Sequence, residues 1–125
     1  GYYLDGQIAM SFEGLEGKKK MEGIMETLRQ QSLTEIGGLP LKETEDYLVG
    51  QGKNLLDGSI YPLELPQANL LRFAFQGGGY IMARPSGTEP KIRFYFCIKG
   101  EKGADLESKL KSTQEAFLKI LDIKE

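Results

Sequence analysis

Residues 70–98, LLRFAFQGGGYIMARPSGTEPKIRFYFCI, show the clearest alternation of apolar and polar side chains in this 125-residue chain. Within this stretch, residues 91–98 alternate throughout, which is typical of a strand with one buried face. The expected core-facing set of that strand is Ile92, Phe94, Phe96 and Ile98. Residues 70–75 alternate in the same way, and the glycines at 77–79 separate them from a further strand at 80–84. The stretch therefore predicts a hairpin followed by another strand of a largely antiparallel sheet.

Two segments outside this stretch show helical periodicity. Apolar side chains recur every three or four positions over residues 18–31 and again beyond Gly100, with charged side chains between them. These apolar positions are Met21, Ile24, Met25 and Leu28 in the first segment, and Leu106, Leu110, Phe117 and Leu121 in the second. Both segments are expected to be long helices with one stripe facing the core.

The remaining residues have weaker patterns. Residues 39–47 are mostly polar on one side, so they are expected to form a strand near a sheet edge. Residues 48–66 are rich in glycine and proline and are expected to form a long connection with no regular element. Residues 1–14 contain three glycines and are expected to be a linker or a remnant of a preceding domain, such as a strand.

Together these patterns predict an α+β fold, with a mainly antiparallel sheet of about four strands and two long helices packed on one face. The domain itself is expected to cover residues 15–125. Hydrophobic residues make up 40% and charged residues 27% of the chain, which is near the average for soluble globular domains.

Composition and charge exclude several kinds of function. Sixteen basic and eighteen acidic residues give a net charge of -2, which argues against a nucleic-acid partner. No apolar run approaches the roughly 20 residues that span a bilayer, so no membrane partner and a cytoplasmic location are expected. The chain has no histidine and one cysteine, Cys97, expected to be a packed, reduced thiol. The usual general base and the ordinary zinc ligand sets are therefore absent.

The segment 84–93, RPSGTEPKIR, concentrates groups that suit a phosphate dianion. Pro85 and Pro90 favour extended backbone at both ends of this loop, which reduces the entropy lost on binding. Gly87 permits a positive φ, so the backbone N–H groups of Gly87 and Thr88 are expected to turn inward as an anion-binding nest.

Side chains add to this expected anion site. Ser86 and Thr88 offer short hydroxyl donors, while Arg84 and Arg93 carry permanent charge on planar guanidinium groups that match phosphate oxygens. Lys91 adds a further positive charge. The spacing alone leaves open a second interpretation, in which the loop is an ordinary turn and the arginines are surface charges.

The run RPSGTEPKIRFYF resembles the phosphate-binding signature of the C-terminal domain in the α-D-phosphohexomutase superfamily. Three further runs resemble the same domain of bacterial phosphoglucomutases: FEGLEGKKKMEGIMETLR, EIGGLPL and EDYL. The resemblance covers nearly the whole chain. It implies that this domain grips the substrate phosphate that is not being transferred.

The resemblance also implies roles for particular residues. The positions that match phosphate contacts are Arg84, Ser86, Gly87, Thr88 and Arg93, with Lys91 as an additional contact. In that family the phosphoserine, the magnesium ligands and the sugar-reading loop lie in earlier domains, and those motifs have no counterpart here. The chain is therefore expected to hold no catalytic residue and no cofactor, and to be inactive alone.

The parent enzyme implied by this resemblance is a phosphoglucomutase or phosphomannomutase, an isomerase of carbohydrate metabolism. It would interconvert hexose 1-phosphate and hexose 6-phosphate, such as those of glucose, through a bisphosphate intermediate, using magnesium bound by its other domains. The expected partners of this chain are the hexose phosphate and the preceding domains of the same polypeptide. The alternative is a freestanding module that binds a phosphorylated ligand or protein.

Overall fold

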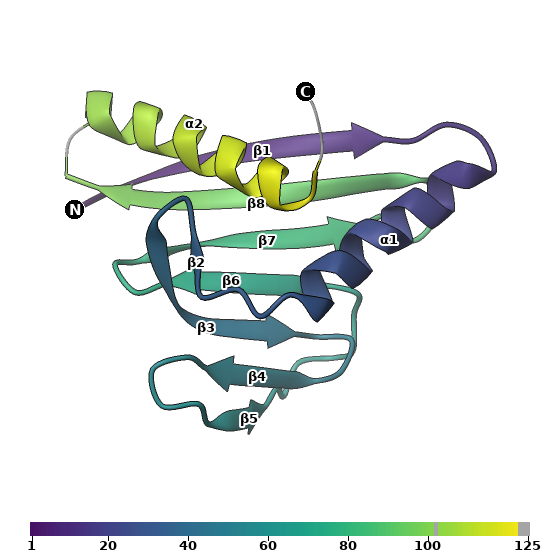
Figure 1. Ribbon diagram of the computed structural model, residues 1–125, viewed down its shortest axis with the longest axis horizontal. Coiled ribbons are helices and arrows are strands. Elements are labelled where there is room, and N and C mark those ends of the chain that lie inside the picture. Colours follow the sequence, from purple (N-terminus) through teal and green to yellow (C-terminus); the bar gives the residue numbers. More distant parts are fainter. Residues whose placement is uncertain (102, 123–125) are drawn as a thin grey trace.

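The computed structural model describes residues 1–101 and 103–122. Its strands are β1 (Tyr2–Ser11), β2 (Glu35–Ile36), β3 (Leu39–Asp46), β4 (Gln51–Asn54), β5 (Ile60–Pro62), β6 (Leu71–Phe75), β7 (Gly79–Pro85) and β8 (Lys91–Gly100), and its helices are α1 (Glu16–Gln30) and α2 (Gly103–Ile120). Seven strands lie in the order β1-β8-β7-β6-β3-β4-β5, with β2 paired to β3 (Figure 1). Every pairing is antiparallel.

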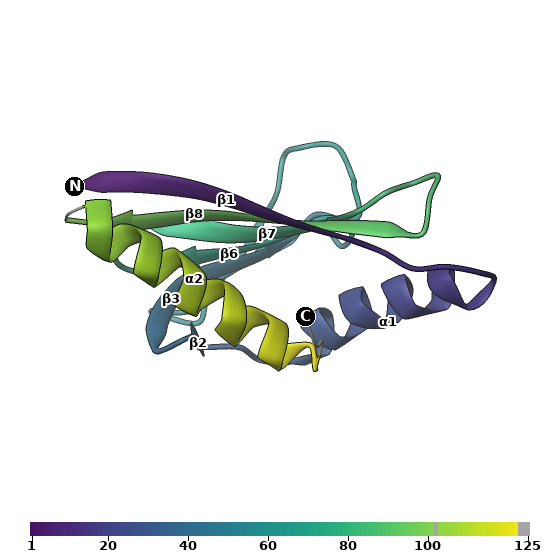
Figure 2. The same cartoon turned by 90° about the horizontal axis from the view of Figure 1, so that it is seen from above.

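Both helices lie on the same side of the sheet, and the other face carries no helix (Figure 2). We call that other side the open face. The apolar stripe of α2 meets the sheet at Phe117, which is fully buried and packs edge-on against Phe94 and Phe96 with ring centroids 5.1 and 5.7 Å apart. The predicted α+β class, the antiparallel sheet and the two helices are confirmed.

The expected number of strands was wrong, because the sheet has eight strands rather than about four. The pattern missed β2, β4 and β5 because they are only two to four residues long and contain glycine, proline and polar residues. Two of these short strands lie within residues 48–66, where no regular element was expected. Strands this short offer too few residues for an alternation to be recognised.

Residues 1–14 contain β1. Of the two alternatives expected for this segment, a linker or a strand, the structure has the strand. Its register with β8 is unbroken from Tyr2 opposite Gly100 to Ser11 opposite Lys91. Gly6 obscured the pattern, and α2 packs closely over it: a Cβ there would lie 2.9 Å from the Gln114 amide and 3.0 Å from Leu110 of α2. That close approach lets α2 cover the edge of the sheet.

The strand over residues 39–46 is present, but its predicted position near an edge was wrong. It pairs with β4 on one side and β6 on the other. Glu43 and Glu45, which made it look like an edge strand, lie on the open face, where Arg72 pairs with both. The polar residues of this strand therefore lie on the sheet face that no helix covers, and they do not mark an edge of the sheet.

The β6–β7 hairpin gives a stability prediction. Gly79 has φ +89°, and a Cβ there would lie 2.2 Å from the carbonyl oxygen of Cys97 on β8. Gly79→Ala is therefore expected to destabilise the fold by about 1–3 kcal/mol or more, as backbone strain of this kind does. Gly77→Ala is the matched control, because a Cβ at Gly77 meets no atom within 4 Å. Thermal unfolding that lowers the Tm of both variants equally would contradict this packing.

Among the described residues, no helix is long and apolar enough to cross a membrane. Cys97 is half-buried on the open face opposite Asp5 of β1, rather than inside the core. Burial and then the neighbouring Asp5 carboxylate raise the pKa of this thiol above its ordinary value.

Candidate functional site

The loop between β7 and β8 lies at one end of the sheet and is tied down on both sides (Figure 2). The Ser86 N–H donates to the carbonyl of Lys91 at 2.7 Å, which closes the base of the loop. The Phe12 N–H donates to the carbonyl of Pro90 at 2.8 Å, which joins the loop to the connection between β1 and α1. The loop is therefore held in place from both edges.

Two arginines face each other across this end of the sheet. Arg84 on β7 and Arg93 on β8 are direct cross-strand partners, and both are exposed. Directly opposite side chains have their Cβ atoms about 4.5–5.5 Å apart, and like charges at that spacing repel. Within residues 1–101 and 103–122, the ion pairs involve Arg29 and Arg72 but neither of these two arginines. The pair is thus an uncompensated positive charge that an anion would relieve.

A cavity of about 280 Å³ lies against this pair. Five of the six predicted phosphate contacts line it: Arg84, Ser86, Gly87, Lys91 and Arg93. Pro85 and Tyr95 complete the lining, whereas Thr88 is exposed outside it. The structure therefore gathers the predicted cations and the Ser86 hydroxyl around one hollow. We call this hollow the cationic cavity.

The backbone of the loop differs from the expected nest. Gly87 does not adopt a positive φ. The Ser86 hydroxyl instead accepts hydrogen bonds from the N–H groups of Thr88 and Glu89, at 3.3 and 3.2 Å. A serine that bonds to nearby backbone in this way forms a local turn that does not need a left-handed residue. Side chains, rather than a backbone nest, supply most of the donors in this conformation.

Tyr95 also lines the cationic cavity, although it is not among the predicted phosphate contacts. It lies on β8 two residues after Arg93, so both side chains project from the open face. The alternation of the strand carried the signal, since it placed Tyr95 with Arg93 and away from the core residues. Tyr95 forms the wall of the cationic cavity away from the loop.

Beside this cavity, the open face carries a connected polar network. The Arg72 guanidinium donates to Glu43 and Glu45 at 3.1 and 3.2 Å. The Tyr61 hydroxyl lies 2.9 Å from Glu45 and 3.2 Å from Glu43, and Tyr47 donates to Glu45 at 3.0 Å. This arginine is therefore neutralised, unlike the pair at the loop, and the network is a structural feature that orders the open face.

The network gives a pH prediction. Burial raises the pKa of Tyr61 above its ordinary 10.0, and the hydrogen bond to and charge of Glu45 raise it further. The unfolded chain loses this phenolic proton first, so the stabilisation is complete below about pH 10 and declines as the pH rises toward the folded pKa. Urea unfolding at about pH 8 and about pH 11 should show a smaller alkaline loss for Tyr61→Phe than for the wild type. If both proteins lose the same free energy of unfolding between these two pH values, the network does not raise the pKa of Tyr61.

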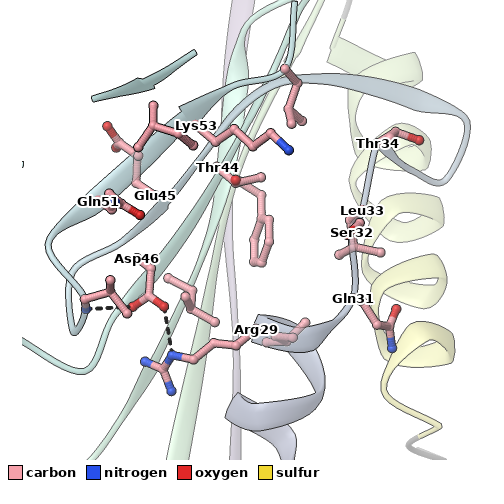
Figure 3. A pocket seen from close by; sticks show the side chains of 17 residues that line it. Arg29, Gln31, Ser32, Leu33, Thr34, Thr44, Glu45, Asp46, Gln51 and Lys53 are labelled. Atoms are coloured by element: carbon pink, nitrogen blue, oxygen red, sulfur yellow. Dashed lines mark hydrogen bonds and ion pairs between the residues drawn. The ribbon is translucent and has the colours of Figure 1, made fainter. Parts of the chain in front are cut away.

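Another cavity, of about 350 Å³, lies on the helix side beside the end of α1 (Figure 3). Its arginine, Arg29, pairs with Asp46 at 3.0 Å, and much of the remaining lining is apolar. Lys53 also lines it. The arginine of this cavity is neutralised by Asp46, so the cavity is less suited to a dianion than the cationic cavity, which has two arginines and a lysine.

The described residues contain no group of three or more side chains placed to hold a metal ion. The closely spaced carboxylates of Glu43 and Glu45 are occupied by Arg72 and Tyr61. These residues do not fit a magnesium ion, and no chemical step is assigned to one in this chain.

Fold and site together define a class of protein: an α+β domain with a helix-free sheet face and a cationic loop at one end of that face. No family model matches the chain. It is 44% identical over 101 residues to the phosphoglucomutase of Staphylococcus saprophyticus, which covers 81% of this chain and 18% of that protein. It is 39% identical over 110 residues to the phosphoglucomutase of Staphylococcus aureus strain MRSA252, which covers 88% of this chain and 20% of that protein.

The relatives confirm the predicted resemblance: the chain matches the C-terminal domain of bacterial phosphoglucomutases. It spans about a fifth of the length of these curated relatives. A crystal structure of the open form of the Paramecium phosphoprotein pp63/parafusin, a phosphoglucomutase, aligns with a TM-score of 0.49 at 20% identity. That alignment covers 98% of this chain and 20% of the Paramecium chain, and is too distant to add to the argument.

Proposed function

We propose that this chain is the domain of a phosphoglucomutase-type enzyme that grips the substrate phosphate not being transferred. One observation carries the proposal: Arg84 and Arg93 face each other across the loop that resembles the phosphate-binding signature, and no carboxylate of the described residues pairs with either of them. Phosphate and guanidinium form short, charge-assisted hydrogen bonds with matching planar geometry. The cationic cavity therefore supports a phosphate site.

In this proposal each side chain has a separate task. Arg84 and Arg93 approach the phosphate from two adjacent strands, and Lys91 adds charge from the wall of the cavity. The Ser86 hydroxyl, whose oxygen already accepts two backbone N–H groups, directs its own proton to a phosphate oxygen. Gly87 lines the cavity with no side chain, so a ligand can approach its backbone, while Thr88 would contact the ligand only after the loop moves.

The parent enzyme would be an isomerase that transfers a phosphoryl group to a hexose phosphate, such as glucose 1-phosphate or glucose 6-phosphate. The resulting bisphosphate would reorient and return its other phosphoryl group to the enzyme. This domain would therefore hold each of the two phosphates in turn. The phosphoserine and the magnesium ion belong to domains outside this chain, in a cytoplasmic enzyme. Residues 15–125 form the phosphate-binding domain, and residues 1–14 bring the chain from the preceding domain while β1 completes the sheet.

Calorimetric titration of the chain tests this function. Inorganic phosphate and glucose 6-phosphate are expected to bind with a Kd on the order of millimolar, because a few exposed charge-assisted bonds must offset the association entropy. Free glucose should show no binding. A coupled mutase assay on the same sample should read blank, since the nucleophile and the metal ligands lie elsewhere. Absence of phosphate binding, or turnover that is lost on mutating a residue of this chain, would contradict the proposal.

A further inference from the structure

The open face has a second hollow directly beside the cationic cavity. It measures about 350 Å³ and is lined by Asp5, Gly6, Gln7, Tyr80, Tyr95 and Phe96. Tyr95 lines both hollows, so they share one wall. We call this second hollow the tyrosine cavity.

The strand register fixes how the two cavities are aligned. Tyr95 follows Arg93 on the same face of β8, and successive same-face positions lie about 7 Å apart along a strand. Gln7 on β1 is directly opposite Tyr95, and Asp5 is the next same-face residue on β1. A molecule held at Arg93 by one end therefore extends along the strands past Tyr95 toward Gln7 and Asp5.

The chemistry changes in order along this line. The cationic end suits a phosphate, the two tyrosine rings offer an apolar surface with polar tips, and Asp5 accepts hydrogen bonds from hydroxyl groups. Gln7 both donates and accepts. A cation at one end, aromatic rings in the middle and hydroxyl-binding groups at the far end together match a phosphorylated polyhydroxy ring.

The tyrosine cavity is also held in a defined shape. The Arg72 guanidinium lies 5.2 Å from the centre of the Tyr80 ring, and Glu43 and Glu45 fix that guanidinium from the other side. The polar network thus orders one wall of the cavity. A wall ordered before binding reduces the entropy that a weakly held ligand must offset.

We propose that the tyrosine cavity is a subsite for the sugar ring of the hexose phosphate whose phosphate lies between Arg84 and Arg93. This inference rests on the proposed function. The C–H face of the ring packs on Tyr95, and its hydroxyl groups bond to Gln7 and Asp5.

Such a subsite suits a ligand that must bind in two orientations. An aromatic surface and a glutamine amide recognise ring faces and hydroxyl groups without demanding one arrangement of them. The same subsite can therefore receive the sugar whichever of its phosphates is held by the arginines. Hydroxyl configuration is then left to the domains outside this chain.

Amide chemical-shift titrations of the chain with inorganic phosphate and with glucose 6-phosphate test the inference. Both probes should shift the loop over residues 86–88, while only glucose 6-phosphate should also shift Asp5 and Gln7. One or two added hydrogen bonds should make glucose 6-phosphate bind about 3- to 10-fold more tightly than inorganic phosphate.

Gln7→Ala should reduce this difference while leaving the Kd for inorganic phosphate unchanged, because Gln7 lines only the tyrosine cavity. Gln51→Ala is the matched control, because it removes an exposed strand glutamine outside both cavities. Equal affinity for both probes, with no shift at Asp5 or Gln7, would overturn the subsite and leave the phosphate site intact. If neither probe shifts the loop, the proposed function itself fails.

Discussion

Arg93→Ala is expected to raise the Kd of the chain for inorganic phosphate by at least about tenfold, because it removes a charge-assisted contact that contributes about 1.5–3 kcal/mol. In the parent enzyme the same contact would correspond to a loss of about 10- to 150-fold in kcat/KM. Folding should be spared, since Arg93 is exposed while its neighbours Ile92 and Phe94 are buried. Arg93→Lys should recover only part of the affinity, because an ammonium lacks the planar fork.

Calorimetry and thermal unfolding on the same samples separate the explanations. Lys111→Ala is the matched control, because it removes one positive charge from an exposed position of α2, which lies on the helix side of the sheet. If Arg93→Ala and Lys111→Ala weaken phosphate binding equally, net charge rather than a site determines binding. If Arg93→Ala unfolds the chain, Arg93 has a structural role and the assignment of a phosphate site to it is wrong.

Phe117→Ala is expected to destabilise the chain by about 3–5 kcal/mol, the range found for large-to-small changes of buried aromatic residues. Phe117 is fully buried and packs against the rings of Phe73, Phe94 and Phe96, with centroids 6.5, 5.1 and 5.7 Å away, so one side chain joins α2 to three central strand residues. A loss of that size is a large fraction of the roughly 5–15 kcal/mol that stabilises a typical domain.

Urea unfolding measures this loss, and Tyr2→Ala provides the comparison. Tyr2 is 65% exposed on the edge strand β1, so its truncation should cost less than about 1 kcal/mol. If the two truncations have similar effects, α2 does not close the core in the way that the ring contacts indicate.

The fold could be predicted where one side of an element is continuously apolar. The strand over residues 91–98 and both helices were found because burial imposes a period of two or of about 3.6 on their side chains. Residues 1–14 and 48–66 could not be assigned in this way. In β1 a glycine at position 6, closely covered by α2, interrupts the alternation, and β4 and β5 are held by pairing with neighbouring strands.

The residues that line the cationic cavity could mostly be predicted from the sequence, but the backbone conformation of its loop could not. Charge and strand alternation were enough to place Arg84 and Arg93 together on the open face. The conformation of Gly87 could not be predicted, because the Ser86 hydroxyl accepts hydrogen bonds from backbone N–H groups that an anion-binding nest would use. The place of Tyr95 in the cavity lining could not be predicted either, because an aromatic residue in a strand looks the same in sequence whether it packs or lines a cavity.

A structure of the chain determined in the presence of inorganic phosphate tests the central claim most directly. The phosphate is predicted to lie in the cationic cavity between Arg84 and Arg93, with guanidinium nitrogens about 2.7–2.9 Å from its oxygens. Phosphate bound instead at Lys18–Lys20, or beside Arg29 in the cavity of Figure 3, would contradict the account.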